Sequence, residues 1–545
     1  MSLRRRDLLA AGAALALPSC RRGDLPRTLV PDTPCPVPSY FSTWGLQRAA
    51  ESDPARWQMS WKLPSAAADR LTEPRVFGPE GWAQSFKPVH SDLNFLLDLG
   101  WDMAPATPFE TEPWRLGSLE VSSAKFPSCT GTPADRLAKL VDRVKMLGWR
   151  GLGVRVAAQV HGAGRDGGKL SGSDVESHFR TQLRAAHLSG VGYWKVDSPG
   201  NAGVGFRRIL STIAYGEAPN LALEHTLPWD ALNDQMISGK TGIATGSGRF
   251  RTWSQGQWLE SAVEVLGFSR VFRTNEATAQ LSIPTTLDRV ADLLMGGGGA
   301  RGNDCIINCE DEVYMAAALG CSMAIMRHPS CKDPLLTGSD PRLLRSRSIE
   351  VIRALKWLRI APPYPVGYTK TNLHTTRLDD DWRFKTGETP FGWVEGMLVR
   401  QGAPSIVARN SPLPKVESQG SPPYVVTSKH PNGATAIATL PRAFAGRGFV
   451  HPEVDVTLEV EDPAKPIGIF GRYRSLTLDL IGPPLNARVM AQDLASSEAV
   501  DVTDRVNLAG STLVLPGELI NQLGGAAGPR GDQSDPGLVL QIFRV

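Results

Sequence analysis

Short apolar runs alternate with amphipathic segments through the first two thirds of the chain. Eight runs have the length and composition of buried strands, and they begin near residues 40, 95, 151, 192, 221, 270, 305 and 322. Between them, apolar positions recur at helical spacing, most clearly over residues 133–144 and 284–294. Strands and helices that alternate in this way predict a parallel sheet closed into a (β/α)₈ barrel over residues 39–362.

The pattern changes after Pro362 and Pro363, where the helical periodicity fades. From about residue 381 onward, short runs alternate apolar and polar positions, as in residues 453–460, and are separated by Pro, Gly and Asn. This pattern predicts an all-β region over residues 363–545, either one sandwich-like domain or two small modules. A chain of 545 residues has room for it, since domains typically hold about 100 to 200 residues.

The first 20 residues have the pattern of an export signal. An arginine cluster at residues 4–6 precedes an apolar stretch at residues 8–17, which is shorter than the roughly 20 residues that a membrane-spanning helix needs. The cluster resembles a twin-arginine signal, and residues 17–20 resemble a lipobox that ends at Cys20. We therefore expect an exported protein, periplasmic or at the cell surface, held to the membrane by a lipid on Cys20. The five prolines of residues 21–38 predict an extended tether.

Composition narrows the classes of partner. Charged residues make up 21 % of the chain and hydrophobic residues 41 %, which is typical of a globular protein with a sizeable core. The formal charge is +4, and basic residues do not cluster with aromatic residues after the signal, so nucleic acid is not an expected partner. No motif for a cofactor or a metal ion is found, and none is expected. Seven cysteines leave six once Cys20 is lipidated, and we expect these to be buried thiols.

The fourth predicted strand ends in Lys195, Val196 and Asp197. Residues two apart in a strand point to the same face, and the carboxyl ends of barrel strands line the active site. A carboxylate beside an ammonium group stays ionised, which suits a nucleophile. The same pair would also fit a purely structural contact at the end of the barrel.

Other strand ends carry acidic and aromatic side chains suited to a sugar. An aromatic ring can stack on the apolar face of a sugar while carboxylates bind its hydroxyl groups. Retaining glycosidases need two carboxyl groups about 5 to 5.5 Å apart. The further candidates for catalysis or substrate binding are Trp44, Asp98, Trp101, Asp102, Glu224, Arg273 and Glu276. The acidic run Glu310, Asp311 and Glu312 is instead expected to be a solvated helix start, where acids are favourable.

Residues 123–127, 148–153 and 193–197 together resemble the clan of retaining α-galactosidases and α-N-acetylgalactosaminidases, glycoside hydrolase families 27 and 36. The resemblance covers about residues 39–360. It implies that Asp197 is the nucleophile, that Lys195 binds a hydroxyl group and that Arg273 holds the sugar near the nucleophile. It also implies sugar binding by the strand-two segment, which contains Asp98, Trp101 and Asp102.

The chain departs from this clan at two places. Ala277 stands where relatives place the acid/base aspartate, so Glu276, one position earlier, becomes the acid/base candidate and Glu224 the alternative. Ser198 and Pro199 replace an asparagine and a cysteine that follow the nucleophile in relatives. We therefore expect a divergent retaining glycosidase, with a non-catalytic sugar-binding lipoprotein as the alternative. A protease or esterase is excluded, because neither a Gly-x-Ser-x-Gly nor a His-Glu-x-x-His motif is present.

Overall fold

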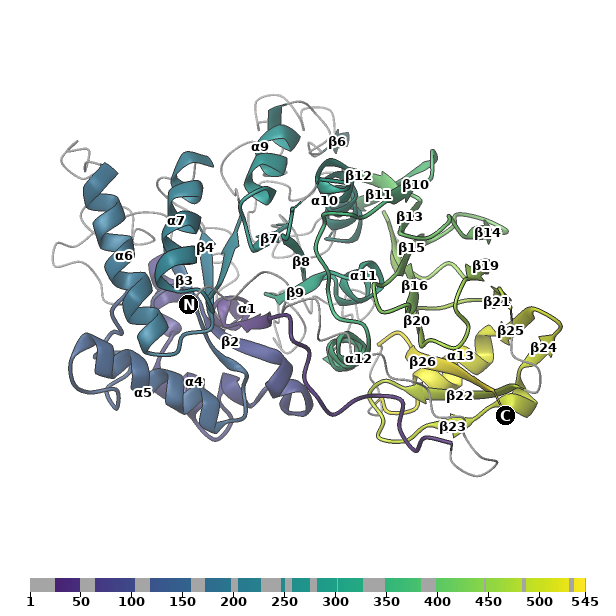
Figure 1. The fold of residues 1–545 in the computed structure, drawn as a ribbon, viewed down its shortest axis with the longest axis horizontal. Coiled ribbons are helices and arrows are strands. Elements are labelled where there is room, and N and C mark those ends of the chain that lie inside the picture. The colour runs from purple at the N-terminus through teal and green to yellow at the C-terminus, as the bar shows by residue number, and fades with distance from the viewer. Residues whose placement is uncertain are drawn as a thin grey trace.

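The computed structural model contains a closed parallel barrel followed by a domain rich in strands (Figure 1). It describes residues 25–49, 64–102, 118–157, 172–197, 204–226, 247–249, 257–274, 282–300, 302–326, 348–383, 398–445, 447–482, 487–528 and 534–544. Both parts of the predicted fold class are confirmed.

All eight predicted strands are present in the barrel. Their order is β1-β2-β3-β4-β5-β7-β8-β9, and the sheet closes where Tyr40 of β1 pairs with Ala324 of β9. Every neighbouring pair is parallel. The strands are β1 (Ser39–Ser42), β2 (Leu93–Leu97), β3 (Gly151–Ala157), β4 (Tyr193–Asp197), β5 (Ala222–His225), β7 (Val271–Arg273), β8 (Ile306–Glu310) and β9 (Ser322–Ile325).

Helices connect the barrel strands and bury one apolar face against them. In α5, Thr132 and Asp135 form a capping box, and Leu137, Leu140 and Val144 are buried, as the periodicity of this segment predicts. The barrel helices after β2 are α5 (Pro133–Met146), α6 (Gly172–Leu188), α7 (Val204–Glu217), α9 (Gln257–Leu266), α10 (Ser282–Gly297), α11 (Val313–Leu319) and α12 (Ser348–Ile360). Those between β1 and β2 are α1 (Trp44–Ala49), α3 (Pro64–Arg70), α4 (Glu73–Phe77), η1 (Trp82–Gln84) and η2 (Lys87–Asp92).

The C-terminal domain is built on two large sheets. One has the order β10-β13-β15-β16-β20-β26-β22-β23, and the other has the order β14-β19-β21-β25-β24. The strands of the first are β10 (Thr371–Leu373), β13 (Ile406–Arg409), β15 (Tyr424–Lys429), β16 (Thr435–Leu440), β20 (Ile467–Phe470), β22 (Ala487–Asp493), β23 (Val500–Asp501) and β26 (Gly537–Arg544). Those of the second are β14 (Lys415–Glu417), β19 (Asp455–Val460), β21 (Ser475–Leu480), β24 (Asn507–Ala509) and β25 (Thr512–Pro516). The remaining elements are β17 (Arg442–Phe444), β18 (Gly448–Val450), η3 (Thr503–Arg505) and α13 (Gly517–Gly524).

The larger sheet is covered on both faces. Alternate residues such as Val425 and Ile437 share a core with Leu476 and Leu478 of the smaller sheet, which makes the sandwich. Residues of the opposite face, such as Val426, belong to the same apolar core as the barrel helices α11 and α12. The barrel and the β-domain are therefore joined by a continuous core.

A third sheet links the two parts of the chain. The strand β6 (Ser247–Arg249) pairs in parallel with β12 (Leu398–Pro404), which also pairs with β11 (Arg377–Arg383). The sequence pattern does not predict β6, since three residues carry too little periodicity to indicate a strand.

The described part of the proline-rich segment lies against both domains. The amide of Ala499 donates to the carbonyl of Arg27 at 2.8 Å, and the amide of Cys35 donates to Asp92 Oδ1 at 2.9 Å. This segment is the purple trace that runs from the β-domain to the barrel in Figure 1. The export signal and Cys20 lie outside the described residues. Within the described part of the chain, no helix has both the length and the apolar character needed to cross a membrane.

The described cysteines are buried free thiols, as predicted. They are Cys35, Cys129, Cys305, Cys309 and Cys321. Cys331 lies outside the described residues.

Candidate active site

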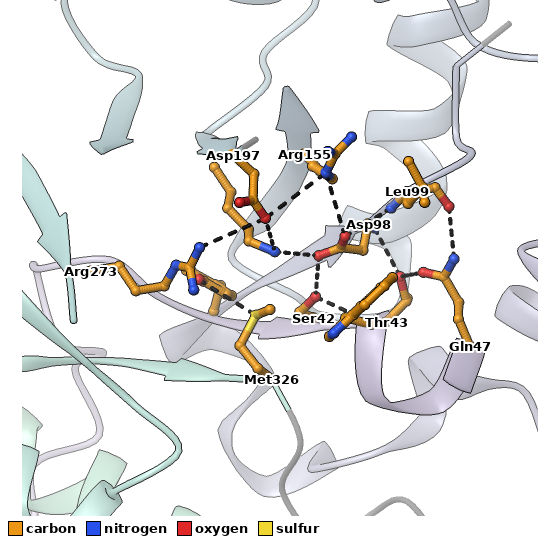
Figure 2. A network of polar contacts seen from close by, with 12 residues as sticks. Ser42, Thr43, Gln47, Asp98, Leu99, Arg155, Asp197, Arg273 and Met326 are labelled. Carbon is orange, nitrogen blue, oxygen red and sulfur yellow. Dashed lines mark hydrogen bonds and ion pairs between the residues drawn. The ribbon is translucent and has the colours of Figure 1, made fainter. Parts of the chain in front are cut away.

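A cluster of charged side chains lies at the carboxyl ends of the barrel strands (Figure 2). Because parallel strands all end at the same rim, residues far apart in the sequence meet there. We call this set the mouth cluster, and its members are Ser42, Asp98, Arg155, Lys195, Asp197, Arg273 and Glu310.

Asp197, the last residue of β4, lies among three cationic groups. Its Oδ2 atom is 3.2 Å from Lys195 Nζ, 3.7 Å from Arg273 Nη2 and 3.9 Å from Arg155 Nε. These cations favour the ionised carboxylate. The side chain of Asp197 is 19 % exposed, whereas those of Asp98 and Glu310 are 2 % and 1 % exposed. Asp197 is therefore the acid of the mouth cluster that a molecule from solvent can reach.

Asp98 orients the ammonium group of Lys195 through a hydrogen bond. Its Oδ2 atom accepts hydrogen bonds from Lys195 Nζ at 2.7 Å and from Ser42 Oγ at 2.9 Å. Its Oδ1 atom accepts from the amide of Leu99 at 2.9 Å. The ammonium group of Lys195 thus lies between Asp98 and Asp197, and its side chain is 1 % exposed. The two ion pairs fix this positive charge directly beside the Asp197 carboxylate.

Glu224 of β5 is in register with Lys195 on the neighbouring strand and is fully buried. Its Oε1 atom accepts from Tyr40 Oη at 3.1 Å and Arg273 Nε at 3.0 Å. Its Oε2 atom accepts from Tyr193 Oη at 2.7 Å and Asn308 Nδ2 at 3.1 Å. Burial raises the pKa of Glu224 although Arg273 opposes this effect. With both oxygens enclosed, Glu224 is placed to position Arg273 rather than to meet a substrate.

Arg273, at the end of β7, connects three carboxylates. Its guanidinium group pairs with Glu310, is 3.0 Å from Glu224 and is 3.7 Å from Asp197. Burial lowers the pKa of Arg273, but Glu310 and the other acids more than reverse this and raise it well above its ordinary value. A planar group with five fixed donors can hold three acids at set angles, which a lysine could not do.

The strand-two segment after Asp98 turns into the protein. Trp101 is 2 % exposed, and its Nε1 atom donates to the carbonyl of Arg155 at 2.7 Å. Asp102 accepts from the amide of Leu119 at 3.2 Å, and burial raises the pKa of Asp102 to about 6. The ring of Trp101 and the carboxyl group of Asp102 are both enclosed by other residues. Their sugar-binding roles stay predictions.

Trp44 is the half-buried aromatic residue beside the mouth cluster. Its amide nitrogen is 3.2 Å from Ser42 Oγ, and its ring packs against the barrel-interior residues around Tyr40. Its role in stacking on a sugar ring stays a prediction. Glu276 lies outside the described residues.

One expectation about this rim is wrong. Glu310, Asp311 and Glu312 are not a solvated helix start, because they are 1 %, 6 % and 0 % exposed. Glu310 is the last residue of β8 and pairs with Arg273, while Asp311 Oδ1 accepts from the amide of Met326 at 2.7 Å. The strand is longer than its apolar run, so Glu310 belongs to the barrel rim. Glu312 does stand at a helix start, as the N-cap residue of α11, but it is buried rather than solvated. No metal-binding group of three or more acidic, histidine or cysteine side chains occurs among the described residues.

Sequence reasoning missed two charged members of the mouth cluster, Arg155 and Glu310. Arg155 had one usable signal, a charged residue inside an otherwise apolar strand. It is only 8 % exposed and contacts both Asp98 and Asp197 at 3.9 Å.

No family model and no curated protein matches the chain. Among solved structures, a putative chitinase A from Streptomyces coelicolor is 14 % identical, covers 43 % of this chain and 71 % of its own, and has a TM-score of 0.23. A maltogenic α-amylase from Thermotoga neapolitana is 10 % identical, covers 93 % and 98 %, and has a TM-score of 0.33. The carboxyl transferase domain of Rhizobium etli pyruvate carboxylase is 13 % identical with a TM-score of 0.26. Its alignment covers 59 % of this chain, which spans about half, 48 %, of that structure. These neighbours differ in chemistry and are distant, so they do not decide the activity of this chain.

Proposed function

We propose that this protein is a retaining glycoside hydrolase with Asp197 as its nucleophile, acting on α-galactoside-like or α-N-acetylgalactosaminide-like substrates. The observation that carries the proposal is the Asp197 carboxylate, the most exposed acid of the mouth cluster, held among Lys195, Arg155 and Arg273. A carboxylate fixed in this way at the end of a barrel strand has the charge and access that a nucleophile needs. The substrate class follows from the family resemblance of the sequence.

The reaction would proceed by double displacement. Asp197 attacks the anomeric carbon and forms a glycosyl ester as the bond to the leaving oxygen breaks. Glu276 gives its proton to that oxygen. In the second step Glu276 takes a proton from water, the water oxygen attacks the anomeric carbon, and Asp197 leaves as a carboxylate.

The remaining groups would bind the sugar. Lys195, whose ammonium group is paired with Asp98 and Asp197, would donate to a hydroxyl group of the sugar, as the family resemblance implies. Trp44 would stack on the apolar ring face. Glu224 would act through Arg273, since it is fully buried and bonded at both oxygens.

Glu276→Ala tests the assignment of the acid. We expect it to slow hydrolysis of an alkyl glycoside far more than that of a nitrophenyl glycoside, because a nitrophenolate leaves without protonation. Added azide should restore part of the nitrophenyl activity, since it replaces the base-activated water in the second step. Equal losses on both substrates, with no effect of azide, would assign the proton donor to another acid.

We also propose that the protein is exported and anchored by a lipid on Cys20. The support is the arginine cluster, the apolar stretch and the lipobox-like residues 17–20. Cells that express the protein with a labelled fatty acid should label it, and Cys20→Ser should remove the label. Unlabelled protein that retains residues 1–20 in the cytoplasm would contradict this prediction.

A further inference from the structure

A second pocket lies at the opposite end of the barrel from the mouth cluster. Its lining includes the first residues of four barrel strands, Gly151, Ala222, Val271 and Ile306. We call it the floor pocket, and its volume is about 430 Å³. This volume lies in the range of roughly 300 to 1,000 Å³ that small-molecule sites occupy.

The floor pocket is lined by three cationic side chains and, among the described residues, by no Asp or Glu. The cations are Lys145, Arg150 and Arg270. None of the three has a described carboxylate within 4 Å. Burial lowers the pKa of Arg150 and outweighs the charge of Asp92, which raises it. Asp92 is itself paired with Arg359 at 2.6 Å. Three like charges around one cavity repel one another unless an anion lies between them.

Backbone contacts hold the two arginines in place. Arg150 donates to the carbonyls of Cys35 and Pro36, and Arg270 donates to those of Pro219 and Leu221. Carbonyl groups orient a guanidinium group without neutralising its charge. The arginines are therefore ordered before any ligand binds, which lowers the entropic cost of binding.

A buried amide side chain also lines the floor pocket. It belongs to Asn94, which is only 2 % exposed. A Cβ atom at Gly151 would lie 3.1 Å from Asn94 Oδ1, and one at Gly192 would lie 2.9 Å from it. The two glycines thus leave space for this amide in the wall of the cavity.

We propose that the floor pocket binds the phosphate group of an anionic small molecule, through Lys145, Arg150 and Arg270. A phosphate offers several acceptor oxygens and up to two negative charges, which matches one ammonium and two guanidinium groups better than a single carboxylate does. The cavity also has room for an organic portion beyond the phosphate. This site is separate from the mouth cluster and does not depend on the proposed glycosidase activity.

Isothermal titration of the full-length protein with inorganic phosphate and with glycerol phosphate, at constant ionic strength in chloride buffer, tests the site. We expect saturable binding that weakens at least tenfold in Lys145→Glu and in Arg270→Gln. Lys145 is exposed, so its replacement leaves the fold intact. Lys87→Ala is the matched control, because Lys87 is also an exposed lysine but does not line the pocket. Its affinity should equal that of the wild type.

The same variants distinguish a soluble phosphate from a lipid headgroup. Vesicles that contain phosphatidic acid and vesicles of phosphatidylcholine alone would be compared by co-sedimentation, with and without glycerol phosphate. Binding of glycerol phosphate without preference for the acidic vesicles indicates a soluble ligand. Preference for acidic vesicles that Lys145→Glu abolishes and glycerol phosphate competes away indicates a headgroup. Absence of binding to every probe, or equal binding by wild type and both variants, overturns the proposal.

Discussion

Asp197→Ala is expected to lower the turnover of a nitrophenyl α-glycoside by about 10⁴-fold or more while the protein stays folded. A loss of this size corresponds to roughly 5 kcal/mol of transition-state stabilisation. The reason is that alanine removes the atom that would bond to the anomeric carbon, and no other acid of the mouth cluster is exposed enough to replace it. Stopped assays of nitrophenol release would measure the effect. Circular dichroism and the melting temperature would report on folding.

The anomeric configuration of the product formed when azide rescues Asp197→Ala tests the same assignment. Azide can enter the space that the carboxylate leaves in Asp197→Ala and attack the sugar from the same side, in a single displacement. The glycosyl azide should then have the opposite anomeric configuration to the substrate. Asp197→Asn, which keeps the shape and removes the charge, should be as inactive as Asp197→Ala but should not respond to azide.

Two outcomes would contradict the assignment. Near-full activity in Asp197→Ala would place the nucleophile elsewhere. A wild-type protein that binds the sugar in titrations but releases no aglycone from a panel of aryl glycosides would instead support the non-catalytic sugar-binding alternative.

Arg353→Ala is expected to destabilise the protein by about 3 to 5 kcal/mol. Arg353 lies on α12 and forms a bidentate ion pair with Asp493 at the end of β22, at 2.9 and 3.0 Å. Its Nη1 atom also donates to the carbonyl of Asp535 at 3.0 Å. Both side chains of the pair are 1 % exposed, so alanine would leave a buried, uncompensated carboxylate between the barrel and the β-domain.

Equilibrium denaturation in urea, with limited proteolysis of the domain junction, would measure this effect. The control is Arg488→Ala, which breaks an ion pair between Arg488 and Asp501 with side chains 52 % and 30 % exposed. Such surface pairs contribute about 0 to 1 kcal/mol. Similar losses in both variants would show that the Arg353 pair is not a specific link between the domains.

The positions of the barrel strands could be predicted because their signal is local. Each strand contains a short apolar run, because every strand residue of the closed barrel except Asp197 is buried. Lys195 and Asp197 could be paired from sequence because residues two apart share a face whatever surrounds them. A strand end is hard to predict where a charged residue interrupts the apolar pattern, as at Glu310. A whole strand is hard to predict where it is too short to show a pattern, as in β6.

Periodicity and strand polarity, which act over a few residues, are enough to predict the closed barrel, the β-domain and the carboxylate and ammonium groups that end β4. Which of the acids a molecule from solvent can reach depends instead on tertiary contacts. Asp98, Glu224 and Glu310 are as charged in the sequence as Asp197, but they are enclosed by side chains from other strands, such as Tyr40, Tyr193 and Arg273. Burial and ion pairing depend on which strands become neighbours when the sheet closes, and no single stretch of sequence contains that information.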